Sequence, residues 1–326
     1  MNSGPYIHSG STTRALMVQA IAALAPVLAA AIWSYGSHAL VLIVSAVVAA
    51  CAADALCDRR RALDSSAVLA GVIFACLLPG NAPWWIAALG GVIAITLGKH
   101  WYGGLGRNPF NPAALACVLL MGLFPLQFFA PRWTVDGVTS ATLLAKEIDS
   151  VAPAVADLLF SRHAGTLGEA MPLAILIGGI VLLALKTIDW RIPLCYLATL
   201  SLLALLLPPG DRMTGHAPWL AGNPLAHLLG GGSLFAAFFM LTDPVTSPFS
   251  PGGRVAYAIL AALVTMLIRF YTPYPDGVVY AVLLANASVP LIDRYANRLL
   301  QNAMIRDRKR PAEEQQESMT GGELPG

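Results

Sequence analysis

The segment ALMVQAIAALAPVLAAAIW, residues 15–33, contains no charged residue and is long enough to cross a lipid bilayer as a helix. A helix needs about 20 mostly apolar residues to span the hydrocarbon core, with about 17 to 25 as the working range. On this criterion the chain is expected to contain ten spans. Their approximate limits are 15–33, 39–56, 66–79, 83–98, 111–129, 170–186, 192–208, 224–241, 255–271 and 277–293.

The composition of the whole chain also indicates a membrane protein. Of the 326 residues, 57% are hydrophobic and only 12% are charged, whereas an average soluble chain is about 25% charged. A formal net charge of +2 is too small to indicate a nucleic-acid partner, and the basic residues are spread over loops. We therefore expect an all-α membrane protein that contacts lipid and does not bind nucleic acid.

Patterns typical of other classes are missing from the sequence. The N-terminal stretch lacks the basic region, short apolar core and cleavage site of a signal peptide, so the first helix should remain in the mature protein. There is no metal-ligand spacing, G-x-S-x-G or P-loop. The five cysteines form no C-x-x-C pair and mostly lie in apolar stretches, where a thiol packs as a small hydrophobe.

Lysine and arginine set the orientation, because cytoplasmic loops carry an excess of both. With the N-terminus inside, 15 of the 20 basic residues fall on the cytoplasmic side and 5 outside. Both termini are then cytoplasmic. The expected division is a cytoplasmic N-terminus (1–14), a first transmembrane half (15–129), an extracytoplasmic or periplasmic segment (130–169), a second transmembrane half (170–293) and a charged cytoplasmic tail (294–326).

Five spans on each side of the polar segment make the second half enter the membrane from the opposite face, as inverted repeats require. The stretches NPFNPAALACVLL (108–120) and YPDGVVYAVLLAN (274–286) are weakly similar to each other, as two copies of such a repeat would be. In each, a proline-containing turn precedes an apolar helix. Proline and glycine also mark ordinary helix starts in membranes, so the similarity fits both a repeat and two unrelated helix starts.

Three ionisable residues lie in or near the expected spans. Asp54 precedes Arg59, Arg60 and Arg61, and we expect it to reach the interface and pair with one of these arginines rather than carry an ion. Asp243 fits an ion path and an ordinary loop equally well. His227 lies near the outer end of its span, where an isolated histidine usually has no special role.

A small, hydroxyl-rich turn, DGVTSAT (136–142), lies in the polar segment between the halves. Its small residues leave a hydroxyl accessible to an enzyme, and Asp136 and Thr139 can hydrogen bond nearby backbone and hold the turn. On local sequence alone the simpler interpretation is a helix cap, with Thr142 or Thr139 opening the run LLAKE.

DGVTSAT resembles the flavinylation motif D-x-x-[ST]-[GA]-A-[TS], in which a flavin transferase joins FMN through its phosphate to the last hydroxyl residue. Ser140 stands where the motif usually has glycine or another small residue. Together with GGLGRNPFNPAA (103–114), TDPVTSP (242–248) and YPDGVVYAVLLAN, the turn resembles the family of the D subunit of the Rnf (Rsx) ion-translocating oxidoreductase. The B subunit of the sodium-translocating NADH:quinone reductase is its homologue. The resemblance runs from about residue 10 to residue 300.

This resemblance implies a subunit of a redox-driven ion pump that couples electron transfer between ferredoxin and NAD to movement of Na⁺ or H⁺ across the bacterial inner membrane. It implies covalent FMN on Thr142, with Asp136 and Thr139 supporting the motif, and a flavin transferase and the other Rnf subunits as partners. It leaves room at GKHWYGGLGRNPFNPA (98–113) for a second, noncovalent flavin or for the ion pathway, while an ordinary loop before a proline-capped helix start is the other interpretation of this stretch.

The subunit is not expected to be active alone, because it has no dinucleotide-binding motif and no catalytic residue of its own. An inverted-repeat solute permease without a redox cofactor is the alternative, since transport and ion-coupled electron transfer both use this architecture. Only the DGVTSAT turn separates the two, because a permease has no need of a transferase recognition sequence.

Overall fold

The computed structural model describes residues 12–58, 65–129, 132–133, 139–140, 159–160, 165–207, 223–272 and 276–298. These residues are mainly helical, which confirms the expected all-helical class. Extended backbone is paired at two places in the described chain: one antiparallel pair of two-residue strands, β1 (Arg132–Trp133) and β2 (Thr139–Ser140), and an isolated bridge between Pro79 and Thr166.

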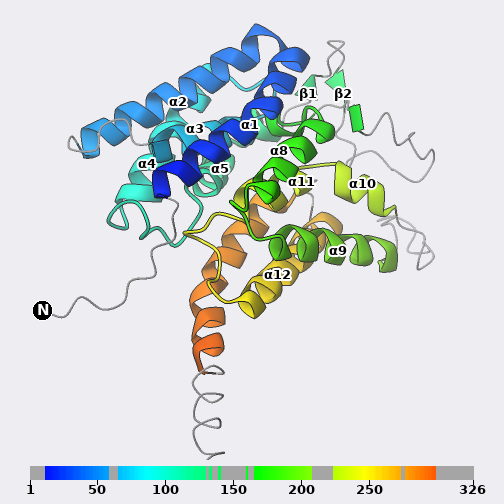
Figure 1. Ribbon diagram of the computed structural model, residues 1–326. Coiled ribbons are helices and arrows are strands. Elements are labelled where there is room, and N and C mark those ends of the chain that lie inside the picture. Colours follow the sequence, from blue (N-terminus) through cyan, green and yellow to red (C-terminus); the bar gives the residue numbers. More distant parts are fainter. Residues whose placement is uncertain are drawn as a thin grey trace, which may run out of the picture.

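Two groups of helices lie on either side of this strand pair in the chain. The first group is α1 (Thr13–Tyr35), α2 (Ser37–Cys57), α3 (Ser65–Cys76), α4 (Trp84–Ile95) with a π-helical turn (Thr96–His100), α5 (Pro112–Leu123) and α6 (Pro125–Phe129). The second is α8 (Pro172–Ala184), α9 (Arg191–Leu206), α10 (Pro224–Leu229), α11 (Ser233–Phe235) with a π-helical turn (Ala236–Met240), α12 (Pro251–Tyr271) and a last helix, Val278–Arg298. A 3₁₀ turn, Leu167–Glu169, precedes α8. We call these groups the first and second halves; they form the blue-to-cyan and green-to-orange parts of Figure 1.

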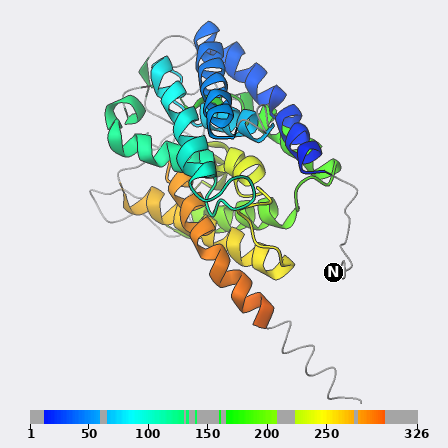
Figure 2. The ribbon, with the colours of Figure 1, turned by 90° about the vertical axis from the view of Figure 1, so that its left-hand side faces the viewer.

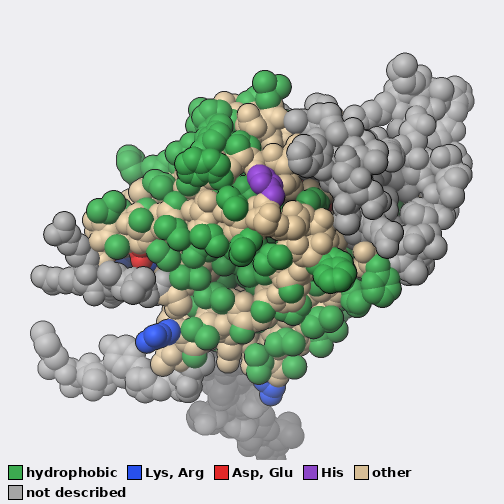
Figure 3. All heavy atoms as spheres, turned by 90° about the horizontal axis from the view of Figure 1, so that it is seen from above, with side chains coloured by type: hydrophobic (Ala, Val, Ile, Leu, Met, Phe, Trp, Pro, Cys, Tyr) green, Lys and Arg blue, Asp and Glu red, His purple; other side chains and the backbone are tan. Residues whose placement is uncertain are grey.

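The helices have the length and composition of a multi-pass membrane protein. Among the described residues, four helices are long and apolar enough to cross a membrane: Thr13–Tyr35, Ser37–Cys57, Pro251–Tyr271 and Val278–Arg298. Shorter apolar helices lie at four other expected spans: Ser65–Cys76, Pro112–Leu123, Pro172–Ala184 and Arg191–Leu206. Hydrophobic side chains cover much of the described surface in Figure 3, and charged ones are few there. The number of crossings and the inverted relation of the halves stay predictions.

Two expected spans are interrupted, and each interruption has a local cause. The span expected at 224–241 is broken after Leu229, because the chain turns at Gly231 with a φ of 69°, a conformation that glycine adopts without strain. The span expected at 111–129 ends at Leu123 and resumes at Pro125, whose ring cannot continue the hydrogen bonding of the preceding helix. Short helical pieces separated by turns therefore replace two continuous helices.

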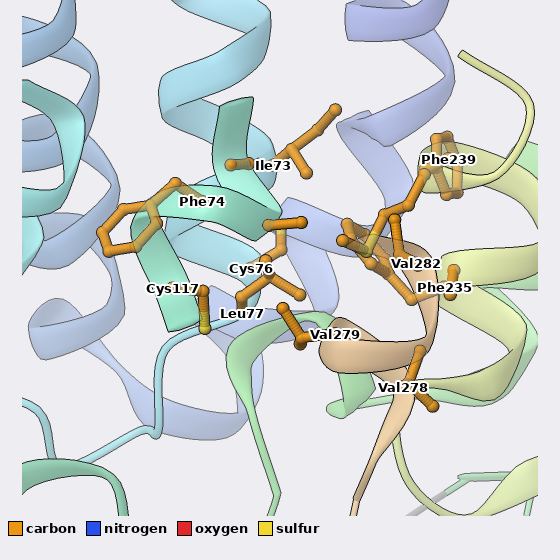
Figure 4. Packing of buried hydrophobic residues seen from close by; sticks show 14 of the residues in the cluster. Ile73, Phe74, Cys76, Leu77, Cys117, Phe235, Phe239, Val278, Val279 and Val282 are labelled. Atoms are coloured by element: carbon orange, nitrogen blue, oxygen red, sulfur yellow. The ribbon is translucent and has the colours of Figure 1, made fainter. Parts of the chain in front are cut away.

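The halves pack closely through small residues and share one apolar core. Gly178 of α8 lies against α1 so closely that a Cβ atom there would be 2.2 Å from the carbonyl oxygen of Ala23. Small residues are what allow membrane helices to approach each other in this way. In the centre, side chains of both halves meet (Figure 4), among them Ile73, Phe74, Cys76, Leu77, Cys117, Phe235, Phe239, Val278, Val279 and Val282. The last helix extends beyond the others at one end (orange in Figure 2).

Candidate functional site

A cavity of about 130 Å³ lies between the two halves. Its lining comes from α1, α3, the π-helical turn after α4, the start of α5, the end of α8, the π-helical turn after α11 and the loop that follows it. Most lining side chains are apolar. The polar ones include Ser66, Lys99, Asn108, Asn111, Thr242 and Asp243. A largely apolar pocket with a few convergent polar groups is typical of a ligand site.

The glycine- and asparagine-rich loop at the cavity has a specific backbone shape. Gly103, Gly104 and Gly106 have φ values of 101°, 98° and 86°, a region that other residues adopt only with strain. The loop then ends at Asn111, whose side-chain oxygen accepts hydrogen bonds from the N–H groups of Ala113 and Ala114 and so caps α5. The sequence GGLGRNPFNPAA therefore fixes where α5 begins and places its first turn at the cavity.

Lys99 is buried at the cavity wall, with 6% of its surface exposed. Its Nζ donates to Oδ1 of Asp54 and to Oγ of Ser66, both at 2.8 Å. Nε2 of His100 lies 2.7 Å from the same Asp54 oxygen. The expectation that Asp54 reaches the interface and pairs with an arginine at 59–61 is therefore corrected: Asp54 is 2% exposed and binds Lys99 and His100. The π-helical turn brings both partners to the inner side of α2, and residues 59–61 lie outside the described chain.

Asn286 connects three separate stretches beside the cavity. Its Oδ1 accepts from the backbone N–H of Asn111 at 3.1 Å, although the two residues are 175 positions apart. Its Nδ2 donates to the carbonyl oxygen of Thr246 at 3.1 Å and to the hydroxyl of Tyr257 at 2.8 Å. Parts of the stretches 103–114, 242–248 and 276–286, which are remote in sequence, thus meet at one place.

The TDPVTSP turn is held by its own aspartate. The Asp243 carboxylate accepts from the N–H of Val245 at 3.1 Å and from the hydroxyl of Thr246 at 3.4 Å. Thr242 donates its hydroxyl to the carbonyl oxygen of Phe238 at 2.6 Å. Asp243 is therefore a loop residue before proline that also lines the cavity, and a role for it in an ion path stays a prediction.

Most of the chain matches the sequence model of one protein family. The model of the NQR2, RnfD, RnfE family matches residues 1–300, which include both halves and the three stretches joined by Asn286. The chain belongs to the NQR2, RnfD, RnfE family.

Three relatives of this chain are named as D subunits of ion-translocating oxidoreductase complexes. The D subunit of the Na(+)-translocating ferredoxin:NAD(+) oxidoreductase complex of Acetobacterium woodii is 38% identical, over 90% of this chain and 92% of that protein. The D subunits of the ion-translocating oxidoreductase complexes of Escherichia fergusonii and Escherichia coli K12 are 36% and 37% identical, each over 90% of this chain and 95% of the relative.

The predicted flavin attachment site of this family member lies mostly outside the described chain. Asp136 and Thr142 are not among the described residues. Thr139 lies in β2, where its backbone is paired with Trp133 of β1. The assignment of FMN to Thr142, with Asp136 and Thr139 in support, stays a prediction.

Sequence reasoning did not anticipate that Lys99 and Arg269 are buried. Both count as loop charges in the orientation argument, yet each is 6% exposed. Leaving them out of the count gives 14 basic residues inside and 4 outside, so the favoured orientation is unchanged. The available signal was their position at the end of an otherwise apolar run, in TLGKH and LIRFY, because a charge at membrane depth is a functional candidate.

Proposed function

We propose that this chain is a membrane subunit of a redox-driven ion pump, an ion-translocating oxidoreductase of the ferredoxin:NAD type that moves Na⁺ or H⁺. Its relatives, 36–38% identical over 90% of the chain, bear the names of such subunits. The observation that carries the proposal is the DGVTSAT turn in a chain that belongs to this family. The turn would give the chain a place for a redox cofactor. The inverted-repeat solute permease remains the competing function.

The proposed redox group is FMN, joined by a phosphoester to the side-chain oxygen of Thr142. The motif register selects this hydroxyl, and the small neighbours Gly137, Ser140 and Ala141 leave it accessible to a flavin transferase. A flavin supplies one- and two-electron transfer, while the protein supplies position and electrostatics. Asp136 and Thr139 support the turn through hydrogen bonds to backbone.

The proposed topology is ten spans in two inverted halves, with both termini in the cytoplasm of a bacterial inner membrane. It is supported by the excess of lysine and arginine on one side of the spans. Residues 130–169, and Thr142 with them, then lie outside the cytoplasm.

Reporter fusions test this topology. A reporter fused after Asp149 should be active only outside the cytoplasm, and one fused after Arg310 only inside, because the charge asymmetry places an odd number of crossings between them. Paired alkaline phosphatase and green fluorescent protein fusions at each site measure both states. Finding both positions on the same side of the membrane would reject the ten-span arrangement.

We propose that a second, noncovalent flavin meets the chain at the cavity between the halves. At about 130 Å³ the cavity would hold only one edge of the ring system between its apolar walls, and the polar side chains beside that edge are Lys99, Asn108 and Asn111. These side chains would bind and orient the ring, and the apolar walls would exclude water from it.

Filling the cavity tests this assignment. Ala20 of α1 lines the cavity, so Ala20→Phe should weaken noncovalent flavin binding at least about tenfold, or by about 1.4 kcal/mol. The measurement is the flavin released on denaturing the purified complex, relative to flavin that stays covalently bound. Ala25→Phe is the matched control, because Ala25 is exposed on the same helix and should change nothing. Equal release from both variants would place the noncovalent flavin elsewhere.

Electron transfer with NAD requires the other subunits of the complex. The chain offers no dinucleotide-binding motif and little soluble surface on which ferredoxin could dock. The partners implied are therefore the remaining Rnf-type subunits, a flavin transferase and membrane lipid.

A further inference from the structure

Two buried cations occupy corresponding places in the two halves. Lys99 lies at the end of the helix formed by α4 and its π-helical turn, and Arg269 lies near the end of α12. These are the fourth helices of the first and second halves in the ten-span arrangement. Each cation is 6% exposed, so each requires partners that offset the loss of hydration.

The partners of the two cations are alike. Lys99 donates to Ser66 Oγ and Asp54 Oδ1, at 2.8 Å each. Arg269 donates to Ser233 Oγ at 2.7 Å and Asp276 Oδ1 at 3.2 Å, and also to the carbonyl oxygens of His227 and Gly230 at 2.8 Å and 3.4 Å. In both halves a cation of the fourth helix thus binds a serine and a carboxylate.

The two serines also have equivalent places in the chain. Ser66 lies in the first turn of α3, and Ser233 is the first residue of α11. Each begins a helical stretch that leads into a Pro-x-x-x-Pro turn, formed by residues 79–83 in the first half and 244–248 in the second. The cation of each half therefore binds the start of the helical stretch that precedes the Pro-x-x-x-Pro turn and joins it to the fourth helix.

The two clusters lie at opposite ends of α1. Ser65, beside Ser66, contacts Met17 near the start of α1, and Met17 and Lys99 line the same cavity. At the other end, Tyr35 is the last residue of α1 and its hydroxyl bonds to Gly165. The segment that follows Gly165 reaches the Arg269 cluster, because a Cβ on Gly232 would lie 3.7 Å from Glu169 and 3.2 Å from Asp276. Since α1 is long enough to cross the membrane, the clusters lie near opposite faces.

We propose that Lys99 and Arg269 are matched latches, one in each half, that close the route to the centre of the molecule from opposite faces of the membrane. Each latch holds the helical stretch before the Pro-x-x-x-Pro turn against the fourth helix. Withdrawing the cation removes the hydrogen bonds that join the fourth helix to the serine and the carboxylate, so these elements can separate and admit water between them. Release of one latch opens one face and leaves the other closed.

The native thiol of Cys76 reports on such opening. Cys76 is 1% exposed and lies in the central apolar cluster with side chains of both halves (Figure 4). The test uses the whole complex in right-side-out and inverted vesicles, with Cys51, Cys57, Cys117 and Cys195 of this subunit replaced by alanine. Labelling of Cys76 by the membrane-impermeant thiol reagent MTSET is followed by the mass of this subunit.

Without a latch substitution, Cys76 should react from neither face. Lys99→Met should make it react at least about tenfold faster in one vesicle orientation, and Arg269→Met should do so in the opposite orientation, because each opens a different end. Lys99→Arg and Arg269→Lys keep the charge and should restore protection. Lys186→Met, at an exposed lysine after α8, is the control and should leave Cys76 protected.

A second pair of variants keeps the test decisive if a single substitution prevents assembly. Asp54→Asn with Lys99→Met, and Asp276→Asn with Arg269→Met, remove each carboxylate together with its cation and should give the same sidedness. Reaction of both latch variants from the same face, from both faces, or from neither would overturn the proposal. The readout is thiol labelling and not bound flavin, and Arg269 does not line the cavity proposed for the flavin, so the Arg269 arm separates failure of this proposal from failure of the proposed function.

Discussion

Thr142→Ala should abolish covalent flavin attachment to this chain. The substitution removes the only oxygen through which the motif register allows a phosphoester, and it leaves the rest of the turn in place. The denatured variant, expressed with a flavin transferase, should show no flavin fluorescence in a gel, and its intact mass should be lower by one attached FMN. If Thr142 were only a helix cap, the change would cost about 1 kcal/mol of stability and leave the flavin untouched.

Two further variants separate the roles of the hydroxyl groups in the turn. Thr142→Ser keeps a hydroxyl at the motif position and should retain covalent flavin. Thr139→Ala removes the alternative hydroxyl and should keep at least part of the flavin, because Thr139 matches the supporting position of the motif. Full flavin on Thr142→Ala together with loss from Thr139→Ala would show that Thr139 is the attachment site.

Gly178→Val should prevent stable packing of the two halves. A Cβ at this position would lie 2.2 Å from the carbonyl oxygen of Ala23 and 3.0 Å from the ring of Phe239, and backbone of α1 cannot move aside without separating from α8. We expect destabilisation of about 3 kcal/mol or more, at or above the upper end of ordinary overpacking. The measurement is the thermal unfolding midpoint and the monodisperse fraction of the purified protein.

Gly122→Val is the matched control for this prediction. Gly122 lies in α5, and a Cβ there would meet no atom within 4 Å. The same glycine-to-valine change should therefore shift the unfolding midpoint only slightly. Similar midpoints for Gly178→Val and Gly122→Val would mean that α1 and α8 do not pack as closely as described.

Local sequence predicted the helices well where the apolar runs were uninterrupted. The segments at 15–33 and 39–56 correspond to α1 and α2 because long apolar stretches have few other stable states in a membrane. The run at 224–241 was expected to be one span, but its three consecutive glycines, Gly230 to Gly232, allow the chain to turn within an otherwise apolar stretch. Hydropathy alone does not distinguish these cases.

The contacts of the candidate site could not be derived from local sequence. Lys99 binds Asp54, which is 45 residues earlier, and the Asn286 side chain binds the backbone of Asn111, which is 175 residues away. The position of Lys99 at the end of an apolar run indicates burial, but the sequence around it does not identify its partners, because they come from α2 and α3. The family resemblance identified the stretches that meet at the cavity, and the fold shows which of their atoms bond.

The intact mass of the wild-type protein, expressed with and without a flavin transferase, tests most directly whether this chain is a flavin-carrying subunit of a redox-driven ion pump. The predicted result is a mass increase equal to one FMN phosphoester only when the transferase is present, with the modified peptide containing residues 136–142. An unchanged mass in the presence of an active transferase would contradict this function and favour the solute permease.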